Sequence, residues 1–287
     1  MAKSTQPLFN QVSIVGLGLI GGSLGMALRK GRVARRVIGF SRHEATIRRA
    51  KDRGAVDDAC TELCPDWLGE SDLVVIATPP LTVVPIARRL VQLTLHRFIL
   101  TDVASTKGEI VQALGSFLPE RITYVGSHPM AGSERSGIGT ANPDLFRGAP
   151  CVVTPVARTS RTAVRRISAL WRSVGGRCIE ISPAHHDTLV AQISHLPHLT
   201  AVGLTLAAQK EAMGLSAGGF SDTTRVALGD PALWREICWT NRRAITSAMD
   251  RLLKELHKLR GLIASGNSDT LTKQFCTAQK KRQRLKR

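Results

Sequence analysis

Short runs of β-branched and aliphatic residues alternate with segments of helical periodicity over the first two thirds of the chain. Strands that alternate with helical segments and are nearly all apolar are typical of a parallel sheet covered by helices on both faces. The pattern therefore predicts an α/β fold with a doubly wound, mostly parallel sheet. Its strands are expected at residues 12–15, 37–40, 73–77, 98–101, 122–125, 151–154 and 178–181.

The pattern changes at Ser182 and Pro183, after which no strand-like run follows. From residue 185 to about residue 265 the apolar positions recur at helical spacing, which predicts an all-helical second part. We therefore expect a sheet domain at 1–182, a helical domain at 183–279 and a basic tail at 280–287.

One long helix is clearly marked in the helical part. Asp230 suits the N-cap and Pro231 the first helical position, and an apolar stripe then continues to Ile263. About thirty helical residues would extend roughly 50 Å. A rod of that length with an apolar stripe needs a packing partner along it, which favours a homodimer built on the helical domain.

The composition supports a folded chain of two domains, because 287 residues are about twice the common domain size and 43% are hydrophobic. The best apolar stretch, residues 73–87, is broken by three prolines and is unsuited to crossing a bilayer. The short segment before the first strand has no apolar core, which argues against a signal peptide. The six cysteines form neither a CxxC pair nor a Cys/His cluster. We therefore expect reduced thiols, no metal site and a cytoplasmic location.

The chain is strongly basic, with 40 Lys+Arg against 22 Asp+Glu and a net charge of +18. A basic surface can attract nucleic acid, but only 4% of the residues are aromatic, which leaves little for stacking on exposed bases. Nucleic acid is therefore not the expected partner. We expect the basic tail at 280–287 to be solvated and disordered, with an electrostatic contact to RNA, a membrane or a partner as the alternative.

A glycine-rich turn joins the first strand to the following helix in VSIVGLGLIGGSLGMAL. Gly16 suits the tight turn, Gly18 allows the backbone to approach a pyrophosphate, and Gly21 allows close helix packing. Leu19 and Ile20 are the first residues of the helix, and their amides are expected to face the pyrophosphate. Because strand, glycines and helix come in the order of a Rossmann site, we predict that this segment binds a dinucleotide.

The next predicted strand ends in Ser41 and Arg42. An NAD enzyme usually presents an acidic residue here to the ribose 2′-hydroxyl, and that acid is missing. A hydroxyl followed by a guanidinium suits a 2′-phosphate, so NADP is the predicted cofactor. The alternative is that Arg42 is one more surface charge and that either NADP or NAD is used.

Polar residues follow three further predicted strands, at the edge where a doubly wound sheet gathers its site. Thr78 and Pro79 follow one strand, TDVASTK occupies 101–107, and GSHPMAGSE occupies 126–134. His128 comes directly after a strand, in what we expect to be a stiff loop. An imidazole can take a hydroxyl proton near neutral pH, so His128 is a candidate catalytic base, with a structural role as the alternative.

The helical part carries two further polar segments. His195 and His198 lie on one helical face in ISHLPHLT, with Pro197 expected to kink the helix. No carboxylate or cysteine lies at ligand spacing nearby, so they are predicted to face a substrate or to pack structurally rather than to bind a metal. In GGFSDTTR, Arg225 offers a planar fork suited to a carboxylate, or else an ion pair to Asp222.

Taken together, GLGLIGGSL, TDVASTK, SHPMAGSE, ISHLPH and GFSDTTR resemble, in this order and at this spacing, the prephenate/arogenate dehydrogenase family of tyrosine biosynthesis. The likeness runs from about residue 12 to residue 263, and SHPMAG and DTTR are its specific parts. It implies a Rossmann domain followed by an all-helical dimerisation domain, and an oxidative decarboxylation with hydride transfer to a nicotinamide. We expect no second catalytic segment before Val12 and no regulatory domain after Ser265, which implies a monofunctional dehydrogenase.

The resemblance also implies roles for single residues. His128 would take the proton of the ring 4-hydroxyl, and Ser105 would orient both that histidine and the nicotinamide. Arg225 would hold a substrate carboxylate. The HLPH segment would line the substrate pocket, with His198 as the first contact and His195 as the second.

The choice between prephenate and arogenate stays open in the sequence, because the two differ only in a keto or an amino group on the side chain. An ammonium group calls for an acidic partner. The candidates are Asp222, Asp230 and Glu134.

Two other interpretations stay open as well. Other two-domain Rossmann enzymes, such as β-hydroxyacid dehydrogenases and pyrroline-carboxylate or ketopantoate reductases, typically rely on a lysine in the helical half, where the segment from His195 to Arg225 offers only Lys210. The second alternative is a protein without catalytic activity that senses NADP or binds nucleic acid through its positive charge.

Overall fold

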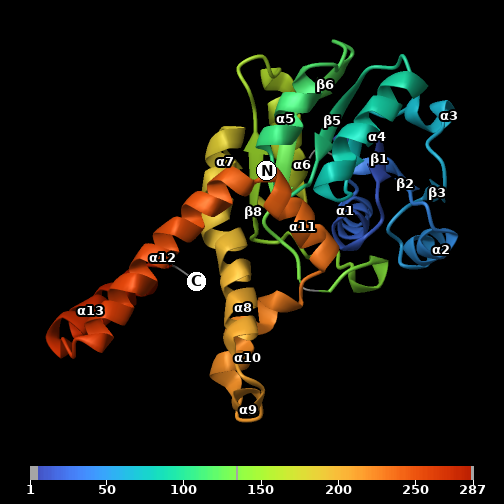
Figure 1. Cartoon of the computed structure of the whole chain (residues 1–287). Helices are drawn as coiled ribbons and strands as arrows, with labels where there is room; N and C mark the ends of the chain where they lie inside the picture. Colours follow the sequence, from blue (N-terminus) through green and yellow to red (C-terminus); the bar gives the residue numbers. More distant parts are fainter. Residues whose placement is uncertain (1–5, 134, 286–287) are drawn as a thin grey trace. The chain divides into compact units, whose positions relative to one another are not determined.

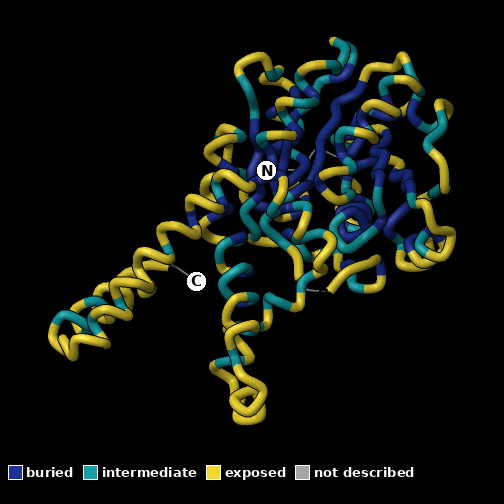
Figure 2. Tube along the Cα trace, in the orientation of Figure 1, coloured by how far each residue is buried: buried dark blue, intermediate teal, exposed yellow. Residues whose placement is uncertain are grey.

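The computed structural model describes residues 6–133 and 135–285 (Figure 1). The chain forms two compact units, which divide between Arg242 and Arg243. The first unit holds both β-sheets and the helices packed around them, and the second holds the two last helices. Figure 2 shows the strands of the first unit mostly as buried backbone.

A six-stranded parallel sheet lies at the centre of the first unit, in the order β3-β2-β1-β4-β5-β6. The chain starts in the middle at β1, moves outward to β3 and then crosses back to β4. This change of direction between β1 and β4 is the switch point at which doubly wound sheets bind ligands, beyond the carboxyl ends of the strands. The strands are β1 (Phe9–Val15), β2 (Ala34–Phe40), β3 (Asp58–Cys60), β4 (Leu73–Ile76), β5 (Phe98–Asp102) and β6 (Ile122–Tyr124).

Each face of this sheet has its own apolar core, because successive strand residues point to opposite faces. Ile14 packs into one core together with side chains of α1 (Leu19–Lys30) and α6 (Arg161–Ser173). Its neighbour Val15 packs into the other. That second core is completed by α3 (Pro65–Leu68), α4 (Pro80–Leu93) and α5 (Gly108–Gly115), while α2 (Glu44–Asp52) lies next to β3. The predicted doubly wound parallel sheet is confirmed.

A second sheet of three strands contains β7 (Gly126–Pro129), β8 (Pro150–Thr154) and β9 (Arg177–Glu180). Strand β8 lies in the middle, antiparallel to β7 and parallel to β9. The prediction that the runs at 151–154 and 178–181 belong to the main sheet was therefore wrong. These two strands form a separate sheet with β7 instead. Strand β7 is short and contains Ser127 and His128, so no apolar run marks it in the sequence.

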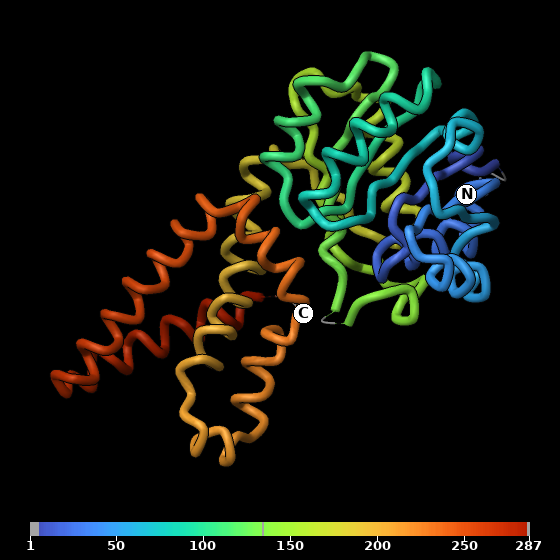
Figure 3. The backbone as a smooth tube through the Cα atoms, turned by 45° about the vertical axis from the view of Figure 1, so that its right-hand side comes forward, coloured from blue at the N-terminus to red at the C-terminus, as the bar shows by residue number. Residues whose placement is uncertain are grey.

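Helices occupy the chain after Ser182, whose side chain accepts a hydrogen bond from the His185 amide at 3.3 Å and caps α7 (Pro183–Val190). One turn of π-helix, Ala191–His195, leads directly into α8 (Leu196–Ala207), and Pro197 lies in the first turn of α8. Figure 3 shows the chain returning beside α8 through α9 (Lys210–Met213), α10 (Gly218–Thr224) and the 3₁₀ turn Arg225–Leu228.

The predicted single rod after Asp230 is two helices, α11 (Pro231–Thr240) and α12 (Arg242–Ala264). Asp230 caps the first helix as predicted, accepting a hydrogen bond from the Ala232 amide at 2.8 Å. The break lies at Asn241, whose backbone has φ −124° and ψ 26°. Its side chain is engaged in tertiary hydrogen bonds, which hold a non-helical backbone that the periodicity does not reveal.

The chain turns back after α12 at Gly266, which has φ 65°, and continues as α13 (Ser268–Gln283). Lys258 Nζ donates to Gln274 Oε1 at 3.1 Å between these two helices. The expectation of a disordered tail from residue 280 was wrong for residues 280–283, which are helical. Their cations lie at the helix carboxyl end, where positive charge is favourable. Lys286 and Arg287 lie outside the described residues.

None of the helices within residues 6–133 and 135–285 is long and apolar enough to cross a membrane. The domain boundary at Ser182 stays a prediction. It coincides with the capped start of α7, whereas the compact units divide at Arg242.

Candidate active site

The glycine turn after β1 contains two glycines that no other residue could replace without strain. Gly16 has φ 101°, and a Cβ there would lie 2.6 Å from the carbonyl oxygen of Ala77. A Cβ on Gly21 would lie 1.9 Å from the carbonyl oxygen of Gly16. These two residues therefore allow the tight turn and the close packing of α1 against it.

Gly18 is different, because a Cβ built on it would meet nothing within 4 Å. It is the N-cap of α1, which begins with Leu19 and Ile20. None of the described side chains caps this helix end, and the first turn contains no acidic residue. The open face and the free positive end of the helix dipole fit the pyrophosphate of a dinucleotide. The residues present therefore suit such a cofactor.

The remaining predicted cofactor residues lie at the carboxyl ends of the two strands that flank β1. Ser41 and Arg42 follow β2, where the Ser41 amide donates to the Cys60 carbonyl at 3.2 Å and Arg42 is exposed. Thr78 and Pro79 follow β4, and the Thr78 hydroxyl accepts a hydrogen bond from Thr82 Oγ1 at 2.7 Å. The structure thus brings the glycine turn and these two strand ends to one edge of the sheet.

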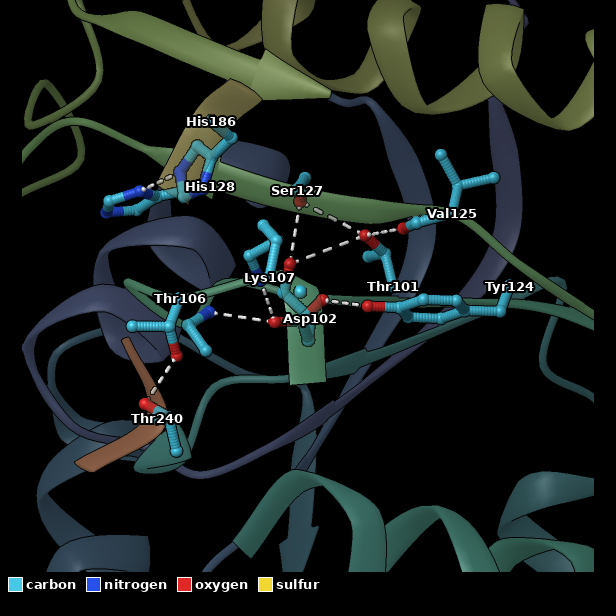
Figure 4. Close-up of polar contacts among 12 residues, drawn as sticks. Thr101, Asp102, Thr106, Lys107, Tyr124, Val125, Ser127, His128, His186 and Thr240 are labelled. Atoms are coloured by element: carbon cyan, nitrogen blue, oxygen red, sulfur yellow. Dashed lines mark hydrogen bonds and ion pairs between the residues drawn. The ribbon is translucent and has the colours of Figure 1, made fainter. Parts of the chain in front are cut away.

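A buried ion pair shapes the loop after β5 (Figure 4). Asp102 pairs with Lys107, and both side chains are fully buried. The Asp102 carboxylate also accepts hydrogen bonds from the Tyr124 hydroxyl at 2.7 Å and from the Ala104 amide at 3.0 Å. Burial lowers the pKa of Lys107, while the carboxylate of Asp102 acts in the opposite sense. These contacts hold the loop from both ends and leave Ser105 partly exposed within it.

His128 lies inside strand β7, not in a loop as the sequence predicted. It pairs with Val152 of β8, and β7 also contacts β5. Its Nδ1 atom lies 2.8 Å from Nε2 of His186, and Nδ1 of His186 lies 2.8 Å from Oδ1 of Asp187 (Figure 4 shows the first of these contacts). Ser105 makes no side-chain hydrogen bond to His128 in the part of the chain that the structure describes, so the orienting contact here comes from His186.

The electrostatic surroundings of His128 favour its neutral form. Burial holds the pKa of His128 well below its ordinary value, and the neighbouring His186, Lys107 and His195 lower it further. A neutral imidazole with one ring nitrogen hydrogen-bonded has its other nitrogen available to accept a proton.

The two histidines of the HLPH segment are buried beside Trp234. His198 stacks on the indole of Trp234, and His195 meets the same ring edge-on at 6.1 Å between centroids. Burial lowers the pKa of His198 and lowers that of His195 to about 4. His195 Nε2 and His198 Nδ1 are buried without a hydrogen-bond partner among the described residues. Both are therefore neutral side chains with unused hydrogen-bonding atoms.

The predicted anion-binding segment lies next to these histidines. Asp222 is an exposed residue of α10, and Arg225 is an exposed residue at the start of the 3₁₀ turn that contacts α8. The carboxylate of Asp230 caps α11. Glu134 lies outside the described residues. Within the ranges 6–133 and 135–285, no group of three or more His, Cys, Asp or Glu side chains is placed to hold a metal ion.

Several side chains of the site escaped the sequence analysis. His186 and Asp187 stand next to each other just after the Ser182 cap, and that adjacent pair is the signal that could have been noticed. Asn241 and Trp234 carry no local signal, because their roles depend on tertiary contacts. Among the residues that the sequence singled out, His128 and His195 lie on one connected network of hydrogen bonds.

Fold and site together define a class of protein: a Rossmann-type dinucleotide-binding protein whose helical second part adds histidines to the site. The sequence matches the nucleotide-binding domain of prephenate dehydrogenase over residues 24–180 and the dimerization domain of prephenate dehydrogenase over residues 182–277. The chain belongs to the prephenate dehydrogenase family.

Two relatives are similar over nearly the whole chain. A cyclohexadienyl dehydrogenase of Zymomonas mobilis is 34% identical over 97% of this chain and 97% of its own length. A prephenate dehydrogenase of Bacillus subtilis is 33% identical over 93% of this chain and 74% of its own length.

Two solved structures share the fold throughout. The prephenate dehydrogenase of A. aeolicus, in complex with hydroxyphenyl propionate and NAD⁺, superposes with a TM-score of 0.89 and 30% identity over 100% of both chains. The arogenate dehydrogenase of Synechocystis has a TM-score of 0.82 and 30% identity over 96% of this chain and 100% of its own. The predicted family and the predicted order of domain types, Rossmann and then helical, are confirmed.

Proposed function

We propose that this chain catalyses the oxidative decarboxylation of prephenate or arogenate, with hydride transfer to NADP, in tyrosine biosynthesis. The observation that carries the proposal is the setting of His128. The buried, neutral imidazole of His128 lies on β7, which contacts β5 of the six-stranded sheet. The glycine turn after β1, at the carboxyl edge of that six-stranded sheet, is open for a dinucleotide. Membership of the prephenate dehydrogenase family supports the reaction type.

The proposed reaction asks little of the protein beyond positioning and one proton transfer. The nicotinamide supplies the carbon that accepts the hydride when the cofactor is bound. His128 takes the proton of the ring 4-hydroxyl through Nε2, which has no hydrogen-bond partner among the described residues, as the hydride leaves the ring carbon that bears this hydroxyl. Loss of the ring carboxylate as CO₂ then sends its electron pair into the ring, which becomes aromatic, and the resulting phenolate oxygen takes up a proton. The remaining task of the protein is to hold the substrate in the reactive orientation.

Arg225 is the residue proposed to hold a substrate carboxylate. A guanidinium offers a planar pair of donors that matches a carboxylate. Its 3₁₀ turn contacts α8, which carries His198, so the anion would be bound beside the two buried histidines. Their unpartnered ring atoms suit the polar groups of the substrate side chain.

Asp222 is the acidic residue proposed to meet the ammonium group if arogenate is used. Asp230 is committed to capping α11, whereas Asp222 is exposed three residues before Arg225. Both prephenate and arogenate enzymes occur among the similar structures, which agrees with either substrate.

NADP is the proposed cofactor because Ser41 and the exposed Arg42 follow β2 where an acidic residue would favour NAD. A hydroxyl and a guanidinium are the donors that a 2′-phosphate needs. The similar A. aeolicus enzyme was solved with NAD⁺, so NAD is the alternative that the assay must include.

A homodimer through the helical region is also proposed. On α12, Met249, Leu253, Leu256 and Ile263 are large, exposed apolar residues with the four-and-three spacing of a helix-packing seam. The match of residues 182–277 to a dimerization domain supports the same conclusion. Sedimentation equilibrium would check it, with a monomer as the contradicting result.

The test of function is a set of four parallel assays. The protein is mixed with prephenate or arogenate and with NADP⁺ or NAD⁺, and the appearance of the reduced nicotinamide is followed by absorbance. We expect turnover with NADP⁺ and at least one of the two substrates. No turnover in any of the four mixtures, from protein that still binds NADPH, would overturn the proposal.

A further inference from the structure

Asp187 is the centre of a buried hydrogen-bond network that reaches two histidines of the site. Its carboxylate accepts hydrogen bonds from the main-chain amides of Lys107 at 2.8 Å and Gly108 at 2.7 Å. Oδ1 also faces Nδ1 of His186 at 2.8 Å, and the main-chain carbonyl accepts from Nδ2 of Asn241 at 2.9 Å. The side chain of Asp187 thus positions His186, and its main-chain carbonyl positions Asn241.

The carboxylate branch determines which nitrogen of His128 carries a hydrogen. Because a carboxylate oxygen accepts, Nδ1 of His186 is the donor, and a neutral His186 then has a lone pair on Nε2. Nδ1 of His128, at 2.8 Å from that lone pair, must donate to it. A neutral His128 therefore has its hydrogen on Nδ1 and a free lone pair on Nε2.

The Asn241 branch has the opposite effect on His195. Nδ2 of Asn241 donates one hydrogen to the Asp187 carbonyl, which fixes the orientation of the amide. Its second hydrogen points to Nδ1 of His195 at 3.2 Å. An amide nitrogen has no lone pair to offer, so Nδ1 of His195 accepts and its hydrogen is on Nε2. That Nε2 is buried without a partner among the described residues.

We propose that Asp187 is a positioning residue that gives the two histidines complementary roles, making Nε2 of His128 an acceptor and, through Asn241, Nε2 of His195 a donor. The chemical meaning of these roles rests on the proposed function: the acceptor takes the hydroxyl proton, and the donor binds an oxygen of the substrate side chain. The assignment of hydrogens itself does not depend on that function. In the competing arrangement a cationic His186 forms an ion pair with the Asp187 carboxylate and donates from Nε2 to Nδ1 of His128, which puts the hydrogen of a neutral His128 on Nε2 instead.

The test is a ¹⁵N NMR measurement of the histidine side chains in substrate-free protein, since protonated and unprotonated ring nitrogens have distinct shifts. The eight histidines are labelled, and the signals of His128 and His195 are assigned by their disappearance in His128→Asn and His195→Asn. We expect hydrogen on Nδ1 for His128 and on Nε2 for His195. Hydrogen on Nε2 of His128, or on Nδ1 of His195, overturns the proposal even if the enzyme assays succeed. If all four assays are silent but both tautomers are as stated, the positioning network stands and the proposed function fails.

Variants supply the second measurement. Asp187→Asn presents an NH₂ group either to the Gly108 amide or to Nδ1 of His186. In the second orientation Nδ1 of His186 becomes an acceptor, so Nε2 of His186 donates to Nδ1 of His128. We expect kcat to fall about 10²- to 10⁴-fold, the range for loss of a positioned proton acceptor, with KM nearly unchanged. The His128 signals should shift toward the other tautomer. The matched control is Asp66→Asn, which changes an exposed carboxylate on α3. A parallel loss of thermal stability and activity with unchanged His128 signals would assign Asp187 to structure alone.

Two substitutions of His186 test the same hydrogen bonds without changing Asp187. The side-chain carbonyl of His186→Gln can still accept the hydrogen on Nδ1 of His128, whereas His186→Leu cannot. We expect the Gln variant to keep at least about tenfold more kcat than the Leu variant. Equal activity of the two variants would contradict the proposed chain of hydrogen bonds.

Discussion

The imidazole of His198 lies flat on the indole of Trp234, with the ring centroids 3.4 Å apart and the planes within 9° of parallel. Gly229 completes this contact, because a Cβ there would lie 2.4 Å from Nε1 of Trp234 and 3.3 Å from Cε1 of His198. Gly229 directly follows the turn that starts with Arg225. The stacked rings therefore fix the segment that carries the proposed carboxylate-binding residue.

Arg225→Gln should raise KM for prephenate or arogenate about 10- to 100-fold, because a hydrogen bond to a charged group contributes about 1.5–3 kcal/mol. The KM for NADP⁺ should stay nearly unchanged. Steady-state kinetics check this, with Arg165→Gln on the exposed side of α6 as the control. An unchanged KM for the cyclohexadienyl substrate would assign Arg225 to structure.

His128→Asn should lower kcat about 10²- to 10⁴-fold, because an amide cannot take the hydroxyl proton. Binding of NADPH, measured by fluorescence titration, should change little, since the glycine turn after β1 is not altered. The exposed His96 provides the control variant His96→Asn. Near-normal turnover of His128→Asn would remove this residue as the base.

The acid limb of the pH profile should lie below pH 6.5. The unprotonated form of His128 is the active one, and burial holds the pKa of His128 well below its ordinary value. The fraction of active enzyme therefore stays high as the pH falls through 6.5 and drops only at the lowered pKa. A profile of log kcat/KM against pH reports this value for the free enzyme. An acid limb at or above pH 6.5 would contradict a buried neutral base.

Gly18→Ala should weaken dinucleotide binding by about tenfold or more while the free protein keeps its stability. The added methyl group meets no atom of the described residues within 4 Å and occupies the space proposed for the pyrophosphate. Gly203→Ala is the control, because its Cβ in α8 also meets nothing within 4 Å. Equal NADPH affinity of wild type and Gly18→Ala would show that the cofactor binds elsewhere.

Lys107→Met should lower the free energy of unfolding by about 3–5 kcal/mol, because it leaves the fully buried Asp102 carboxylate without its cation. Lys51→Met removes a partly exposed pair with Asp58 at 2.7 Å and should cost less than about 1 kcal/mol. Urea denaturation of both variants gives the comparison. Equal effects would mean that the buried pair is no more important to stability than the exposed one.

The main sheet could be predicted from the sequence because its strands are buried on both faces. Residues such as Val12 and Val75 belong to apolar runs bounded by turn residues, and the glycine turn adds a signal tied to backbone conformation. Strand β7 could not be found this way. Its polar residues are held by pairing with β8, and such pairing leaves no periodic trace in the strand itself.

The candidate site was predictable where a family motif or a strand end marked the residue, as at His128 and His195. Its connections were not. Hydrogen bonds link His128 to His186 across 58 positions and Asp187 to Asn241 across 54, and only the folded chain brings these residues together. The same contacts explain why the long helix breaks at Asn241, where tertiary hydrogen bonds override a helical pattern.

The position of His128 within a strand has a consequence for the cost of catalysis. A side chain on a loop loses conformational freedom when substrate binds, whereas the backbone of His128 is already fixed by its pairing with Val152. That loss of entropy is therefore incurred once, on folding, and does not recur in each catalytic cycle. Substrate binding should produce little reorganisation at this residue, and slow amide hydrogen exchange in β7 should be found with and without ligand.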